Sequence, residues 1–156
     1  MDLFNVGSAQ VRKSMARDIQ TISDNIRESD REELWSVAHL MPYEAIKTSF
    51  ENSKLCWTVT RFGKSVAIFG VGEPNTVWMI ATKDFSKLNQ KFLKRSRSFI
   101  GLMLAEYPKL ENCVSLRNEA SIKWLLFCGA KFGEVVQYGK DKIPFQKFTF
   151  ERKHVS

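Results

Sequence analysis

The segment from Ser115 to Phe132 constrains the fold more than any other part of the chain. It reads SLRNEASIKWLLFCGAKF, which is the end of a short apolar strand (113–116), a helix-length stretch and the start of a second strand. Asn118 suits a helix N-cap, because its side chain can accept hydrogen bonds from the free amides of the first turn. Gly129 suits the left-handed residue that ends a helix. The segment therefore predicts a strand, a capped helix and a strand in one tight αβ corner.

The composition is that of one globular domain. The chain has 156 residues and a net charge of +7, with 44% hydrophobic and 26% charged residues, which allows a real core. No apolar run approaches the roughly 18 residues of a membrane span, and the N-terminus lacks a signal-peptide pattern. The spacing of Cys56, Cys113 and Cys128 matches no zinc motif. We expect three reduced, packed thiols and no metal site.

Hydrophobic periodicity predicts that the first third of the chain is mostly helical. Residues 1–10 are expected to be a loose arm or a first strand, and Val11 to Ser14 a short strand. Helices are predicted at 16–28, 31–39 and 42–53, the second capped by Ser29-Asp30. The acidic side chains of this region are expected to face water: Asp18, Asp24, Asp30, Glu32 and Glu33.

The rest of the chain alternates strands and helices. Strands 55–62, 65–71 and 76–81 are joined by tight turns at Gly63-Lys64 and at 72–75, which predicts an antiparallel meander. A long helix capped by Asp84 or Ser86 ends at Pro108. Further elements are predicted at 113–116 (strand), 119–128 (helix), 132–138 and 144–150 (strands), with a frayed tail at 151–156. This is an α+β domain with one mixed, mostly antiparallel sheet of six to seven strands and helices on both faces.

The order of elements resembles the GNAT acyltransferase superfamily. The last conserved block of that superfamily has Asn, then a small and an aliphatic residue, then Gly, and here these are Asn118, Ser121, Ile122 and Gly129. The chain is also similar to a narrower GNAT-like family of phage proteins that includes the small internal virion protein of short-tailed phages. The segments CWTVTRFGKSVAIFGV and NEASIKWLLFCGAKF, among others, carry this likeness. The resemblance covers nearly the whole chain as a single GNAT-like domain, 1–156.

The resemblance implies a place for acetyl-CoA. In superfamily members that use it, the strand equivalent to 76–81 separates from its parallel neighbour, here 113–116, and the pantetheine arm bonds the strand backbone in that opening. The pyrophosphate binds at the start of the following long helix. The candidate cofactor-binding residues are therefore Met79, Ile80, Ala81, Ser86, Lys87 and Asn118.

Two features depart from the superfamily pattern. The loop that holds pyrophosphate needs glycine for close backbone approach, but no glycine lies between Gly72 and Gly101. Many relatives have a Tyr that protonates the leaving thiolate seven residues after the motif Asn, and this position is Leu125. Glu73 is the candidate general base, the alternative being a solvated turn residue. His39 and His154 lie outside every motif.

Several residues have two interpretations. Asn118 could cap its helix or contact the cofactor arm. The tryptophans Trp57, Trp78 and Trp124 could line a ligand slot or belong to the core. The basic residues of the long helix could meet nucleic acid or a phosphate group, or form a solvated face. These are Lys87, Lys91, Lys94, Arg95 and Arg97.

The missing glycines and Leu125 favour a phage virion-associated or morphogenesis protein on a GNAT scaffold, without normal acetyl-CoA catalysis. The alternative is an active acetyl-CoA-dependent N-acetyltransferase with a non-standard pyrophosphate loop. The expected partners are other phage virion or assembly proteins. The expected location is the host cytoplasm during infection, with incorporation into the virion.

Overall fold

The computed structural model describes the backbone of residues 2–152 and the side chains of residues 6–152. Five α-helices, one short 3-10 helix and eight strands make up this part of the chain. The strands are β1 (Asp2–Val6), β2 (Ala9–Lys13), β3 (Ser53–Arg61), β4 (Lys64–Gly72), β5 (Thr76–Ala81), β6 (Lys109–Ser115), β7 (Lys131–Tyr138) and β8 (Ile143–Glu151). The helices are α1 (Ala16–Asp24), α2 (Glu28–Ala38), α3 (Pro42–Glu51), the 3-10 helix η1 (Lys83–Lys87), α4 (Gln90–Glu106) and α5 (Glu119–Phe127).

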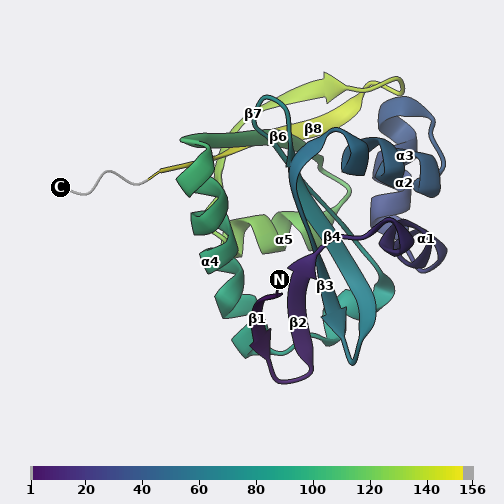
Figure 1. The fold of residues 1–156 in the computed structure, drawn as a ribbon. Coiled ribbons are helices and arrows are strands. Elements are labelled where there is room, and N and C mark those ends of the chain that lie inside the picture. Colours follow the sequence, from purple (N-terminus) through teal and green to yellow (C-terminus); the bar gives the residue numbers. More distant parts are fainter. Residues whose placement is uncertain (1, 153–156) are drawn as a thin grey trace.

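One sheet runs through the whole domain (Figure 1). Its strand order is β1-β2-β3-β4-β5-β6-β8-β7, and every neighbouring pair is antiparallel except β5 and β6. The predicted α+β class with a mixed, mostly antiparallel sheet is confirmed. The sheet has more strands than predicted, because residues 2–6 pair with β2 as a hairpin. Of the two expectations for the first ten residues, a loose arm or a strand, the strand is the one observed.

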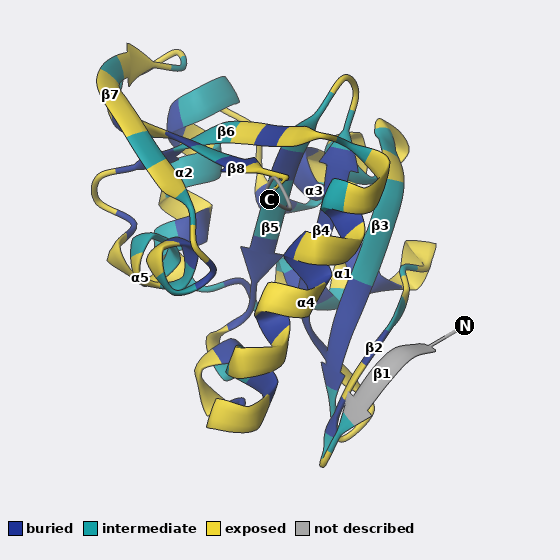
Figure 2. Cartoon of the chain, turned by 90° about the vertical axis from the view of Figure 1, so that its left-hand side faces the viewer, coloured by how far each residue is buried: buried dark blue, intermediate teal, exposed yellow. Residues whose placement is uncertain are grey.

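Helices cover both faces of the sheet, as predicted. On one side lie α1, α2 and α3, and on the other α4 and α5 (Figure 1). The α1–α3 side has a small core rich in isoleucine: Ile19, Ile22, Ile26, Ile46, Ile68 and Ile80. The α4–α5 side has a larger core rich in phenylalanine, including Phe69, Phe92, Phe99, Phe148 and Phe150. The outer face of α4 is exposed (Figure 2).

Asp18 is buried, so the prediction that it faces water is wrong. Its carboxylate accepts two hydrogen bonds from Arg12, at 2.7 and 2.8 Å. The amide of Met15 and the hydroxyls of Thr58 and Ser65 donate to it as well. Burial alone would raise the pKa of Asp18, but these donors outweigh it and lower the pKa to about 2. The ionised carboxylate of Asp18 therefore connects α1 by hydrogen bonds to three strands, β2, β3 and β4.

The predicted long helix is broken near its start. Residues 83–87 form η1, whose N-cap Thr82 accepts from the amide of Asp84. The helix α4 begins only at Gln90, and the side chain of Asn89 caps it by accepting from the amide of Phe92 at 2.9 Å. Asp84 and Ser86 therefore do not cap α4, and Asn89 was the better N-cap signal.

The helix α2 begins earlier than predicted. It starts at Glu28, with Arg27 as its N-cap, so Ser29 and Asp30 lie inside its first turn. An aspartate in the first turn is favourable, because it faces the positive end of the helix dipole.

The turn between β3 and β4 has an unusual residue. Phe62 and Gly63 both have positive φ, 49° and 79°, which is the requirement of a two-residue type I′ hairpin. Glycine meets this at no cost, but a residue with a Cβ loses about 1–2 kcal/mol in the left-handed region. Phe62 is also 75% exposed, so no burial offsets the strain.

The αβ corner formed by β6, α5 and β7 is confirmed. The Oδ1 atom of Asn118 accepts from the amide of Ser121 at 3.3 Å, and Gly129 has a φ of 91°. The cysteines are free thiols. Burial raises the pKa of the Cys128 thiol to about 12, as expected for a packed residue.

Candidate functional site

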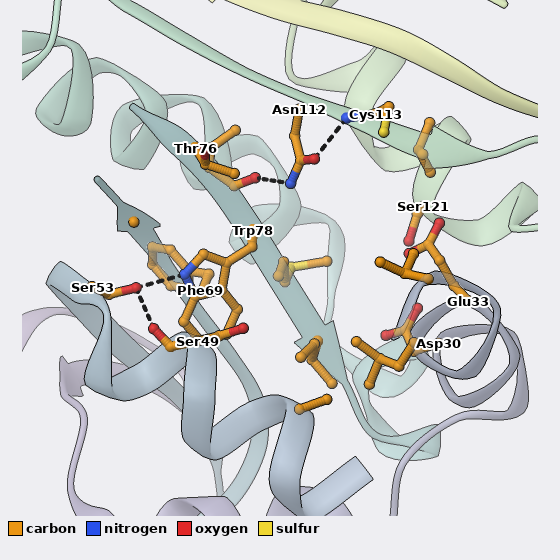
Figure 3. Close-up of a pocket in the computed structure, with 18 of the residues that line it drawn as sticks. Asp30, Glu33, Ser49, Ser53, Phe69, Thr76, Trp78, Asn112, Cys113 and Ser121 are labelled. Carbon is orange, nitrogen blue, oxygen red and sulfur yellow. Dashed lines mark hydrogen bonds between the residues drawn. The ribbon is translucent and has the colours of Figure 1, made fainter. Parts of the chain in front are cut away.

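The parallel strands β5 and β6 separate soon after they meet. They pair as strands only at Thr76 and Glu111 within the described residues. At the next residue, the side chain of Asn112 lies between the strands, and its Nδ2 donates to the carbonyl of Val77 at 2.8 Å (Figure 3). Beyond Asn112 the strands diverge. The separation implied by the resemblance is therefore present.

A cavity of about 440 Å³ passes through this opening. Residues from both faces of the sheet line it, since α2 and α3 contribute on one side and α4 and α5 on the other. Figure 3 shows Trp78 of β5, Cys113 of β6, Ser121 of α5 and the carboxylates of α2 around it. The cavity is therefore bordered by both layers of helices.

At the end of β5, the backbone groups that face the opening are bonded to residues at the start of α2. The amide of Ala81 donates to Oδ2 of Asp30 at 2.8 Å, and the carbonyl of Ala81 accepts from the amide of Arg27 at 3.0 Å. By the alternation of an antiparallel pair, Met79 also turns its N–H and C=O toward β6. Within the described residues, the pairing of β6 with β5 does not extend to Met79.

The two carboxylates of α2 connect the separated strands. Glu33 accepts from the amide of Ser115, at the end of β6, at 2.6 Å. The Nδ2 atom of Asn118 donates to Asp30 at 2.9 Å and lies 3.4 Å from Glu33. Arg27 balances this charge through an ion pair with Asp30 at 2.9 Å. We call Arg27, Asp30, Glu33 and Asn118 the carboxylate bridge.

The prediction that Asp30 and Glu33 face water is therefore wrong. Asp30 is 2% exposed and Glu33 is half-buried, whereas Asp24 and Glu32 are exposed as predicted. The physical reason is the separation of β5 and β6. It leaves buried amides at Ala81 and Ser115 without strand partners, and such donors require an acceptor.

Glu33 is the titratable group of this site. Burial raises the pKa of Glu33 to about 7, and the negative charge of Asp30 adds to the effect, while the hydrogen bond from Ser115 opposes it. Because Glu33 lines the cavity, it could exchange a proton near neutral pH. Arg27, Asp30 and Glu33 were not predicted from the sequence as site residues. Their spacing on one face of α2 was the available signal.

The segment that would hold a pyrophosphate is filled by side chains. Phe85 and Leu88 are buried there. The amides of Asp84, Phe85 and Leu88 donate to oxygens within the segment. The carboxylate of Asp84 adds a negative charge, and hydrogen bonding to Lys87 lowers its pKa, so it is ionised at neutral pH. This turn offers no glycine cradle for a phosphate.

The other predicted cofactor-site residues fall in three places. Met79 and Ile80 line the cavity. Asn118 is 1% exposed, and its side chain is used for the cap and the carboxylate bridge. Ser86 and Lys87 are exposed on η1 and are not among the cavity-lining residues. The structure thus brings together only part of the predicted set.

Of the two predicted catalytic positions, one carries a polar residue at the rim of the cavity and the other an apolar residue inside it. Glu73 lies exposed in the β4–β5 turn, at the rim of the cavity. Leu125 is buried and lines the cavity, so no side chain at that position can donate a proton. His39 is an exposed residue 2.5 Å from Asp141, and His154 lies outside the described residues.

The three tryptophans differ in position. Trp78 and Trp124 line the cavity, whereas Trp57 packs against Phe69 in the core, with ring centroids 5.6 Å apart. The indole N–H of Trp78 donates to Ser53 at 2.7 Å. The indole N–H of Trp124 is buried and has no hydrogen-bond partner among the described residues.

The basic residues of the predicted long helix divide into two groups. Lys87, Lys91, Lys94 and Arg95 are exposed on η1 and the first turns of α4. Arg97 instead contacts the end of α5, where it donates to the carbonyl of Phe127 at 2.9 Å and lies over its ring.

The fold is that of the GNAT acetyltransferases. A GNAT-family acetyltransferase from Bacillus anthracis superposes with a TM-score of 0.67 at 10% identity, covering 97% of this chain and 98% of the other. A spermidine N-acetyltransferase from Vibrio cholerae, solved with CoA and spermine, superposes with a TM-score of 0.65 at 11% identity, covering 94% of this chain and 96% of the other. A GNAT-family acetyltransferase from Streptococcus pneumoniae superposes with a TM-score of 0.60 at 12% identity, covering 93% of this chain and 99% of the other. At these identities the likeness establishes the fold alone.

The sequence defines the family more narrowly. Residues 56–136, just over half of the chain, match the family described as Bacteriophage T7, probable scaffold protein Gp13. The chain belongs to this family of phage proteins. No curated protein matches it. Among the described residues, no helix is long and apolar enough to span a membrane.

Proposed function

We propose that this chain is a virion-associated or morphogenesis protein that uses the GNAT scaffold without normal acetyl-CoA catalysis. Family membership supports a part in phage assembly. In this proposal the partners are other virion or assembly proteins. The protein acts in the host cytoplasm during infection and is incorporated into the virion.

The observation that carries the proposal is the bond between Ala81 and Asp30. The family resemblance assigns the backbone of residues 79–81 to the pantetheine arm. Here the amide and the carbonyl of Ala81 both bond to residues of the same chain. A ligand would have to displace a buried carboxylate that is itself paired with Arg27. Breaking such a pair costs about 3–5 kcal/mol, which opposes cofactor binding.

The filled phosphate segment supports the same conclusion. A pyrophosphate carries negative charge and needs free amides. At this place it would meet the ionised Asp84 and amides that already have acceptors. The apolar Leu125 removes the acid that many relatives supply.

Complementation of a phage that lacks the gene tests the proposal. Wild-type chain and Glu33→Gln, supplied in trans, should restore infectious particles equally, since neither proton transfer nor acetyl transfer is needed. Mass spectrometry of purified particles should detect the chain. Restoration by wild type but not by a folded Glu33→Gln variant would contradict a non-catalytic role, and absence of the chain from particles would contradict incorporation.

An acetyl-CoA-dependent N-acetyltransferase is the second candidate, and the state of Glu33 favours it. A carboxylate with a pKa of about 7 that lines the cavity is suited to act as a general base. The unpaired indole N–H of Trp124 could donate to a ligand carbonyl. Met79 could supply backbone hydrogen bonds to the cofactor.

A transfer assay separates the two candidates. Purified chain would be incubated with labelled acetyl-CoA and an amine panel that includes spermidine and peptides with free N-termini. An active enzyme should lose about 10²–10⁴-fold in rate on Glu33→Gln, while Glu32→Gln, an exposed change on the same helix, should have no effect. No transfer to any panel member would reject this candidate for those acceptors.

A further inference from the structure

The β3–β4 turn combines an exposed aromatic ring with a strained backbone. Phe62 is the most exposed of the large hydrophobic residues in the described chain, at 75%. It adopts a φ of 49°, at a turn position where Asn is the favoured residue and the next residue is already Gly. A Cβ added to Gly63 would meet nothing within 4 Å, so the turn projects into solvent. Neither local preference nor packing explains a phenylalanine here, which suggests a binding role.

One cation contacts this ring, and the turn that carries it is linked to further cations through Asp84. The guanidinium of Arg61 lies 4.9 Å from the centroid of Phe62. Lys64 and Lys87 lie 3.9 and 3.0 Å from Asp84, which connects the turn to η1. The positive charges of Lys87, Lys64 and Arg61 all lower the pKa of Asp84. One carboxylate is thus shared among at least three cations, and a net positive charge remains.

The positive surface continues along η1 into α4. Lys83, Lys91, Lys94 and Arg95 are exposed there, and the residues between them are uncharged apart from Asp84 and Lys87. The turn and the first residues of α4 lie at the same end of the molecule (Figure 1). We call this surface the basic end: Arg61, Phe62, Lys64, Lys83, Lys87, Lys91, Lys94 and Arg95.

We propose that the basic end binds single-stranded nucleic acid, with Phe62 stacking on an unpaired base and the cations of η1 and α4 contacting the phosphates. Proteins that bind single strands without sequence preference combine these two elements, aromatic platforms and a cationic track. This function is separate from the cavity between β5 and β6, so it does not depend on whether acetyl-CoA binds.

Two features favour a nucleic acid over an anionic membrane. Membrane-surface elements present a broad apolar face beside their cations, whereas here one ring projects among charged and polar groups. The ring is stacked beside a guanidinium, an arrangement that also suits the face of a base. An unpaired base is required for stacking, which favours a single strand over a duplex.

The test is fluorescence anisotropy of a labelled 20-nucleotide oligothymidine with the full chain at 50 and 200 mM NaCl. Five phosphate contacts should weaken binding by about 100-fold over this range. Phe62→Asn should weaken binding about fivefold or more at both salt concentrations, with little change in salt dependence. Lys91→Gln/Lys94→Gln should lower the slope of log K against log salt by about 1.4.

The matched control is Lys131→Gln/Lys140→Gln, which removes the same charge from β7 and its following turn, where both lysines are exposed. It should leave the slope nearly unchanged. Circular dichroism melts should show that Phe62→Asn folds, since Asn-Gly suits a type I′ turn. The proposal is overturned by no binding at 50 mM NaCl, by unchanged affinity of folded Phe62→Asn, by an equal loss in the control, or by binding to phosphatidylserine vesicles without binding to the oligonucleotide.

Discussion

The Oδ2 atom of Asp30 accepts a hydrogen bond of 2.8 Å from the amide of Ala81, across 51 residues of sequence. This bond joins α2 to the end of β5, where the sheet opens. Glu33, one turn later, makes the matching bond to Ser115 of β6. The opening of a GNAT fold is therefore spanned by carboxylates of the same chain.

Asp30→Ala should lower the free energy of unfolding by about 3 kcal/mol. The variant leaves the cation of Arg27 without its partner and the buried amide of Ala81 without an acceptor, and both losses are costly. Urea denaturation at pH 7 measures the change. Glu32→Ala, an exposed change on the same helix, should stay within about 0.5 kcal/mol of wild type, and an equally small effect of Asp30→Ala would show that the bridge is dispensable.

Glu33 should make the protein less stable as the pH rises from about 5 to 8. Its pKa in the folded state is about 7, raised from 4.5, so the folded state holds a proton that the unfolded state has released. Stability then falls with pH between these two values, by up to about 3 kcal/mol. Glu33→Gln cannot ionise, and its denaturation midpoint in urea should be much flatter across this range. A wild-type midpoint that rises from pH 5 to 8 would refute the assignment.

Asp18 should make the protein less stable as the pH falls into the acid range, which is the opposite pH dependence to that of Glu33. Its folded-state pKa of about 2 lies below the ordinary 3.8, so its contribution is present above pH 4 and is lost as the pH falls toward 2, by about 2 kcal/mol. Asp18→Asn should cost about 3 kcal/mol at pH 7, because Arg12 loses its buried partner. Guanidinium chloride titrations at pH 3 and 7 would detect both effects, and Asp24→Asn is the exposed control.

Phe62→Asn should stabilise the protein by about 1 kcal/mol. Asn tolerates the left-handed conformation that Phe62 adopts at a cost of about 1–2 kcal/mol, and the exposed ring loses little packing. The melting temperature should rise by a few degrees for a domain of this size. A lower melting temperature would mean that the ring packs on its neighbours more than its exposure indicates.

The sequence predicted the elements that rest on local signals. Asn118 and Gly129 define the limits of α5 because a cap and a positive φ depend on neighbouring residues only. The break before α4 was missed because Asp84 and Ser86 also suit a cap, and the buried positions of Phe85 and Leu88, which distinguish η1, are set by tertiary packing.

The candidate site was harder to predict than the fold. Asp30 and Glu33 carry charge on a short helix, and such residues usually face water. Their burial depends on amides of Ala81 and Ser115, which lack partners only because β5 and β6 diverge. That divergence is a property of two strands far apart in sequence. The absence of glycine before α4 could be seen in the sequence, because this feature depends on residue types alone.

Calorimetric titration of the purified chain with acetyl-CoA tests the central claim most directly. If the bond between Asp30 and Ala81 and the filled segment before α4 exclude the cofactor, no saturable heat should appear up to millimolar ligand. The melting temperature should not shift either, since only a ligand that binds the folded state raises it. Saturable binding at micromolar concentration, with a matching rise in melting temperature, would contradict the account.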